Sequence, residues 1–109
     1  MTDICVAREG EHVKVTPGPE LTAREALLIR SALKLKADGA REIVFDMSGA
    51  KTLDYAGLCL LIAAHNSMRA TGGTVRLVGL SNDIFKLLQG MRLADRLNAA
   101  PASGGGADD

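Results

Sequence analysis

IVFDMSGAKTLDYAGL, which spans residues 43–58, joins a short apolar run to an apolar helix through a polar turn. The first three residues are β-formers and predict a buried strand, and Asp46 ends that strand where the chain must emerge into solvent. Asp54 stands where a helix would begin. Its carboxylate can accept hydrogen bonds from the free amides of the first turn, at the positive end of the helix dipole. The segment therefore predicts a candidate site at a helix N-terminus.

Strands and helices alternate on both sides of this segment. The expected elements are a hairpin of residues 4–7 and 12–15, a helix over 22–37, a strand over 43–45, a helix over 55–70, a strand over 74–78, a helix after Ser81 and a short helical segment over 93–97. Thr22 and Glu25 have capping-box spacing, which predicts that each satisfies an amide at the start of the first helix. This order predicts a single α/β domain, a mixed β-sheet covered by α-helices.

The apolar residues of the first helix predict which of its faces is buried. Ala26, Ile29 and Leu33 can share one face, and we expect Leu28, Ala32 and Leu35 to widen that apolar stripe. Residues 1–98 are expected to form the domain. Residues 99–109, rich in Gly, Ala, Ser and Asp, have no apolar period and predict a disordered tail.

The composition indicates a small soluble module of 109 residues, 47% of them hydrophobic and 24% charged. Lys plus Arg and Asp plus Glu each number 13, so no net charge draws the chain to DNA or RNA, and we expect no direct nucleic-acid binding. No run resembles a signal peptide or a membrane span. The chain is therefore expected to be cytoplasmic, without membrane insertion.

The few cysteines and histidines indicate no chemistry of their own. Cys5 and Cys59 fall in a predicted strand and a predicted helix, and we interpret them as reduced core residues rather than a disulfide. His12 and His65 are far apart and belong to no metal-ligand cluster. No metal and no cofactor are expected.

The segment around Asp54 resembles the STAS domain of bacterial anti-anti-sigma factors, also called anti-sigma factor antagonists. The resemblance covers roughly Ile4 to Leu97. In that family the helix opens with Asp-Ser-Ser-Gly or Asp-Ser-Thr-Gly, and a partner kinase phosphorylates the second hydroxyl residue. The corresponding residues here are Asp54–Gly57, and the position of the phosphoacceptor is Ala56, which has no hydroxyl. The resemblance thus implies the fold without the usual phosphorylation switch.

The resemblance also implies a partner, an anti-sigma factor or related serine-kinase-like ATP-binding protein, which would contact the start of this helix and the loop before it. Tyr55 is the only tyrosine and is expected to supply an apolar contact with a polar tip. The expected partner-binding residues are Asp46, Ser48, Lys51, Thr52, Asp54, Tyr55, Ala56 and Leu58.

Other functions remain open on the sequence. A STAS fold would equally suit a subunit of a lipid-transport ATPase or a scaffold of a stress-signalling complex, because a fold does not decide its partner. A small enzyme could use Asp46 and Asp54 as an acid pair, but no histidine, activated serine or phosphate loop accompanies them, so we expect no enzyme. Ser48 and Thr52 keep hydroxyls in the loop, where a displaced phosphorylation site could lie.

Overall fold

A computed structural model describes residues 4–101 of the chain. The elements, in chain order, are β1 (Cys5–Glu9), β2 (His12–Thr16), β3 (Glu20–Leu21), α1 (Ala23–Lys36), β4 (Glu42–Asp46), β5 (Thr52–Leu53), α2 (Tyr55–Ala70), β6 (Thr74–Leu80), α3 (Asn82–Gly90) and β7 (Ala99–Pro101). The predicted α/β arrangement is confirmed, and three short strands join the elements that the sequence predicts.

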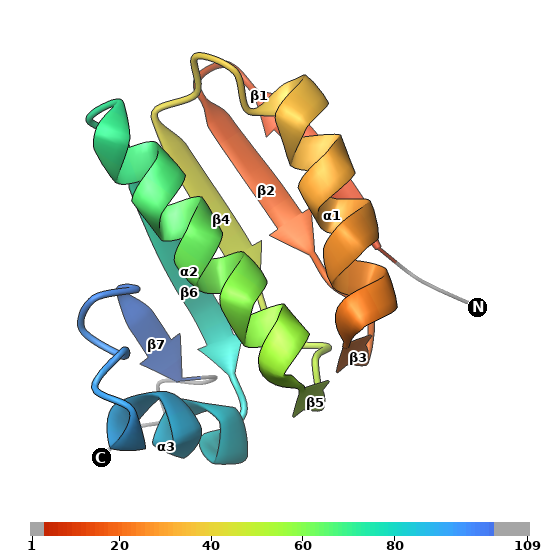
Figure 1. Ribbon diagram of the computed structural model, residues 1–109, viewed down its shortest axis with the longest axis vertical. Coiled ribbons are helices and arrows are strands. Elements are labelled where there is room, and N and C mark those ends of the chain that lie inside the picture. Colours follow the sequence, from red (N-terminus) through yellow and green to blue (C-terminus); the bar gives the residue numbers. More distant parts are fainter. Residues whose placement is uncertain (1–3, 102–109) are drawn as a thin grey trace.

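The main sheet has the order β1-β2-β4-β6-β7. The predicted hairpin is confirmed, because β1 and β2 pair antiparallel, whereas β2, β4, β6 and β7 are parallel. Alternate residues of the central strands, such as Val13, Phe45 and Leu77, are fully buried. They lie under α1 and α2, which cover one face of the sheet (Figure 1). The sheet is therefore mixed, as predicted.

The opposite face of the sheet carries polar and charged side chains that contact one another. His12 Nδ1 lies 3.1 Å from Glu42 Oε1, and Arg76 Nε lies 3.5 Å from Glu42 Oε2. Lys14 Nζ lies 3.7 Å from Asp46 Oδ2. The prediction of a sheet covered by helices thus holds for one face in the central strands, and the alternation of the strands leaves the other face charged.

The predicted apolar face of α1 is too wide. Ala26 and Ile29 are buried and Leu33 is partly buried, but Leu28 is 51% exposed and Leu35 84% exposed. A turn of 100° per residue places these two leucines on the side of α1 away from the sheet. The apolar period of the sequence alone does not distinguish them from core residues.

Three smaller predictions also need correction. Cys5 and Cys59 are exposed rather than core residues, since each points away from the buried face of its element. Thr22 is the N-cap of α1, but its hydroxyl donates to the Glu25 carboxylate instead of accepting from a helix amide. That contact is the first cause of a lowered pKa at Glu25.

The C-terminal part differs from the predicted helix and tail. Residues 93–97 form hydrogen-bonded turns, in which the Leu97 amide donates to the Leu93 carbonyl at 2.9 Å and Asn98 has φ +51°. This turn buries Leu97 and leads into β7, which lies within the predicted tail. The remaining tail, 102–109, lies outside the described residues.

A second, two-stranded sheet pairs β3 with β5, Glu20 with Thr52 and Leu21 with Leu53. The sequence did not reveal it, because two-residue strands have no visible period. It brings the entry to α1 beside the entry to α2 (Figure 1). Gly57, in the first turn of α2, packs directly on this sheet, where a Cβ would overlap the Leu21 carbonyl oxygen and lie 2.8 Å from Leu53 Cδ1.

Gly57→Ala should lower the free energy of unfolding by about 1–3 kcal/mol, because the added methyl group must displace the backbone of β3. Gly90→Ala is the matched control. A Cβ at Gly90, the last residue of α3, meets nothing within 4 Å, so stability should be unchanged or slightly raised. Urea unfolding of both variants gives the comparison, and equal stability of the two would contradict the close contact.

Candidate functional site

The predicted helix cap is present at the start of α2. Asp54 is the N-cap, with extended backbone dihedrals of φ −94° and ψ −177°, and its Oδ1 accepts a hydrogen bond from the Gly57 amide at 2.9 Å. The Asp54 amide donates to the Leu21 carbonyl at 3.3 Å. Asp54 is thus held from both sides, by its own helix and by β3.

Asp46 orders the start of the loop that follows β4. Its Oδ1 accepts hydrogen bonds from the Ser48 amide at 3.1 Å and the Ser48 hydroxyl at 2.7 Å. These two hydrogen bonds, with the Lys14 ammonium beside them, hold the pKa of Asp46 below its ordinary value. The Asp46 carboxylate is therefore ionised at neutral pH and stays an acceptor.

Backbone hydrogen bonds tie the rest of the loop between β4 and β5 to its surroundings. The Met47 amide donates to the Val78 carbonyl at 2.8 Å, and the Lys51 amide donates to the Pro19 carbonyl at 2.7 Å. Met47 and Ala50 are buried, so the loop has its own apolar contacts with the core. Because partners from two distant segments hold it, the loop presents its exposed side chains in one arrangement.

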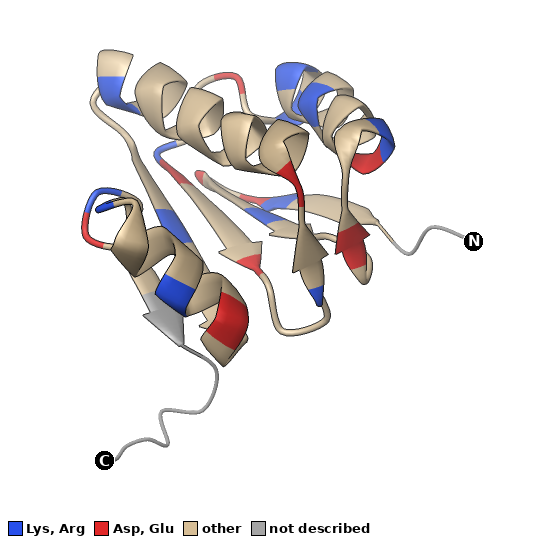
Figure 2. Cartoon of the chain, turned by 60° about the horizontal axis from the view of Figure 1, so that its bottom comes forward, with Lys and Arg blue, Asp and Glu red and all other residues tan. Residues whose placement is uncertain are grey.

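Most of the predicted partner-binding residues lie together on one surface. The loop and the first turn of α2 meet beside β3, at the end of the sheet that comes forward in Figure 2. Tyr55 is 79% exposed. We call this region the α2-start surface and define it by its exposed residues Ser48, Lys51, Thr52, Asp54 and Tyr55 and its partly buried residues Asp46 and Ala56.

Leu58 was predicted to bind the partner, but it does not belong to the α2-start surface. It is only 5% exposed and forms part of the hydrophobic core, because it lies on the face of α2 that packs on the sheet. A contact that the sequence did not reveal is that of Gly79, which has φ +70° and leaves room for Ser48, where a Cβ would lie 3.0 Å from the Ser48 Cβ. Only the glycine itself, after a predicted strand, signals that approach.

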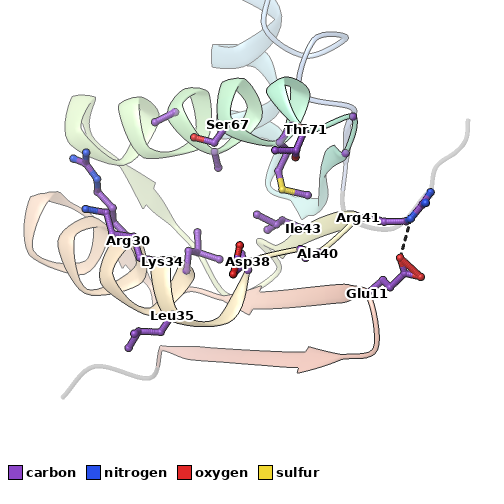
Figure 3. A pocket seen from close by; sticks show the side chains of 18 of the residues that line it. Glu11, Arg30, Lys34, Leu35, Asp38, Ala40, Arg41, Ile43, Ser67 and Thr71 are labelled. Carbon is purple, nitrogen blue, oxygen red and sulfur yellow. Dashed lines mark hydrogen bonds and ion pairs between the residues drawn. The ribbon is translucent and has the colours of Figure 1, made fainter.

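The α2-start surface does not overlap the groove between α1 and α2. A groove of about 1070 Å³ lies between the C-terminal halves of α1 and α2, with Arg30, Ala40 and Ser67 among its lining residues (Figure 3). None of the residues of the α2-start surface lines it. An exposed surface that carries an aromatic side chain and does not line the groove suits contact with a protein more than enclosure of a small substrate.

Two features are absent from residues 4–101. No helix in this part of the chain is long and apolar enough to cross a membrane. Over the same residues, no three His, Cys, Asp or Glu side chains are grouped so that they could hold a metal ion.

Comparison with known proteins identifies the fold. The family model described as STAS domain matches residues 4–104. An anti-sigma-factor antagonist (STAS) domain protein from Planctomyces limnophilus superposes with a TM-score of 0.77 at 18% identity, over 94% of this chain and 92% of that chain. The phosphorylated form of SpoIIAA, a Bacillus cell fate determinant, gives 0.74 at 18% identity, over 89% of this chain and 90% of that chain. Among curated proteins, none matches this sequence.

Asp54→Ala should lower the free energy of unfolding by about 1 kcal/mol, because the Gly57 amide loses its acceptor at the start of α2. Asp54→Asn is the control. It keeps an acceptor oxygen and removes only the charge, so its loss should be smaller. Chemical denaturation measures both values, and an Asp54→Ala variant as stable as the unsubstituted protein would show that the cap contributes nothing.

Proposed function

Because the chain belongs to the STAS domain family, we propose that it is a regulator of the anti-sigma factor antagonist kind, which binds an anti-sigma factor or related serine-kinase-like ATP-binding protein in the cytoplasm. The observation that carries this proposal is Tyr55, 79% exposed on a hydrogen-bonded helix start. Two structural relatives are described as anti-sigma factor antagonists, which supports the class of partner.

Tyr55 suits the role of a central contact residue. Tyr55 is the first residue of α2 and directly follows the N-cap Asp54. Its backbone is therefore already ordered, and little backbone freedom is lost on binding. An exposed tyrosine also offers a large apolar area with one polar tip, a combination enriched among the residues that dominate interface energies. Lys51 and Asp54 add charges of both signs around it.

The α2-start surface acts by binding rather than by catalysis. The lowered pKa of Asp46 keeps this carboxylate ionised, so it cannot serve as a general acid at neutral pH. Asp54 has one carboxylate oxygen engaged by the Gly57 amide. The two carboxylates therefore order the loop and the helix start, and the function needs no cofactor.

Ala56 makes the protein an unswitched binder. It is the second residue of α2, directly before Gly57, at the position where the resembling regulators carry the phosphorylated hydroxyl. A phosphate there would gain hydrogen bonds from the helix amides and a favourable interaction with the helix dipole, but a methyl side chain cannot accept it. Binding to the partner then depends on concentration and on competing proteins, not on a kinase.

Tyr55→Lys should weaken binding to the anti-sigma factor at least about tenfold, because it removes an aromatic contact residue and sets a cation at the positive end of α2. The partner is isolated from native lysate, identified by mass spectrometry and titrated by calorimetry. Asn66→Lys is the matched control, since it adds the same charge to the exposed side of the same helix, about 16 Å along its axis. Equal affinities of the two variants would reject the α2-start surface.

Incubation with a serine kinase of an anti-sigma system and ATP should leave the mass of the unsubstituted protein unchanged. Ala56→Ser should gain one phosphate, and the phosphorylated form should bind the partner more weakly. Intact-protein mass spectrometry measures the modification. A phosphate on Ser48 or Thr52 of the unsubstituted protein that abolished binding would contradict an unswitched binder and place the switch in the loop.

A further inference from the structure

One side of α1 carries an exposed apolar and basic face, and two of its residues, Lys34 and Leu35, also line the groove between α1 and α2. The exposed residues Arg24, Leu27, Leu28, Ser31, Lys34 and Leu35 follow one another at steps of three, one, three, three and one, and we call them the α1 seam. Leu27 is 65% exposed, Leu28 51% and Leu35 84%. Steps of this kind keep residues on one side of a helix, so the three leucines lie along one strip, with Ser31 between Leu28 and Leu35.

The spacing of the α1 seam matches the way in which two helices pack. Leu28 and Leu35 are seven residues apart, a separation of about 10.5 Å along the axis. In a heptad they both take position a, the small Ser31 takes position d, and Leu27 and Lys34 take the flanking position g. A second helix lying along α1 would insert its own apolar side chains around the two leucines, beside the small side chain of Ser31.

The charge of α1 determines the chemistry of that second helix. The helix AREALLIRSALKLK contains four cationic residues and one carboxylate, and the carboxylate of Glu25 is engaged by the Thr22 hydroxyl. Lys36 donates to the Val6 carbonyl at 2.8 Å. Within residues 4–101 neither Arg24 nor Lys34 belongs to an ion pair. Figure 2 shows that Lys and Arg predominate along α1. The complementary surface is therefore apolar and acidic.

We propose that the α1 seam is a docking site for an acidic amphipathic helix of a protein partner, separate from the α2-start surface. The partner helix places leucine-like side chains around Leu28 and Leu35 and carboxylates opposite Arg24 and Lys34. This second site does not depend on the identity of the protein that binds at Tyr55. It gives the domain a means to hold two proteins at once.

Two other occupants fit the observations less well. A second copy related by two-fold symmetry would set the same cations of the α1 seam against each other, with no seam carboxylate to offset the repulsion. An anionic membrane would attract the cations, but the whole chain has zero formal net charge, and the α1 seam has no aromatic residue to enter the lipid interface.

The test uses a synthetic fluorescent peptide of about three heptads with Leu at positions a and d and Glu at e and g, followed by anisotropy. The full chain should bind this acidic peptide saturably, and a peptide with Lys in place of Glu should bind at least tenfold more weakly. Leu35→Ser and Lys34→Glu should each lower the affinity for the acidic peptide about tenfold. This is the expected effect of losing one exposed leucine contact or of reversing one charge. Circular dichroism should show unchanged folding of both variants, because both positions are exposed.

Lys86→Glu, an exposed charge reversal on α3, is the matched control and should bind the acidic peptide normally. Tyr55→Lys should also bind it normally, which separates this site from the proposed function. Equal binding of acidic and basic peptides, or no saturable binding, would overturn the proposal. So would sedimentation with phosphatidylserine vesicles in the absence of peptide binding, or a concentration-dependent dimer that Leu35→Ser abolishes.

Discussion

The contact between Gly57 and the β3–β5 pair is the constraint on which the α2-start surface depends. A side chain at Gly57 would overlap the Leu21 carbonyl oxygen, so only glycine lets α2 begin at this distance from β3. The same Leu21 carbonyl accepts the Asp54 amide, which fixes the cap relative to the sheet. Leu21 of β3 thus determines where α2 starts, and with it the direction in which Tyr55 leaves the surface.

The sequence predicts those features of the fold that repeat with a clear period. The apolar runs around Val13, Phe45 and Leu77 predict strands that the structure confirms, and their alternation explains the single buried face. The two-residue strands β3 and β5 have no period, and their pairing depends on residues more than 30 positions apart. The C-terminal strand β7 was missed for the same reason, since only its register beside Leu77 gives it a sheet partner.

In the candidate site, too, the features that depend on neighbouring residues were predictable, and those that depend on tertiary packing were not. The roles of Asp46 and Asp54 were predictable from the sequence, because each carboxylate accepts a hydrogen bond from an amide only two or three residues away. Leu58 was wrongly assigned to the site. Its burial depends on which face of α2 meets the sheet, and the helix is apolar on most sides. Leu28 and Leu35 were misplaced by the converse error, since leucines on the outer side of α1 were assigned to the core.

The two exposed surfaces differ in what holds them in place. The α2-start surface joins a loop, a cap and a helix turn, and its arrangement depends on hydrogen bonds that the Asp46 carboxylate and the Leu21 and Pro19 carbonyls accept. The α1 seam belongs to one helix. The Arg8 guanidinium donates hydrogen bonds to the carbonyl of Lys36, the last residue of α1, at 2.9 Å, and to the Asp38 carbonyl after it at 2.6 Å. Disturbing the loop would therefore alter the first surface and leave the second intact. Under the two proposals, substitutions in the loop would change the partner of the α2-start surface without changing the α1 seam.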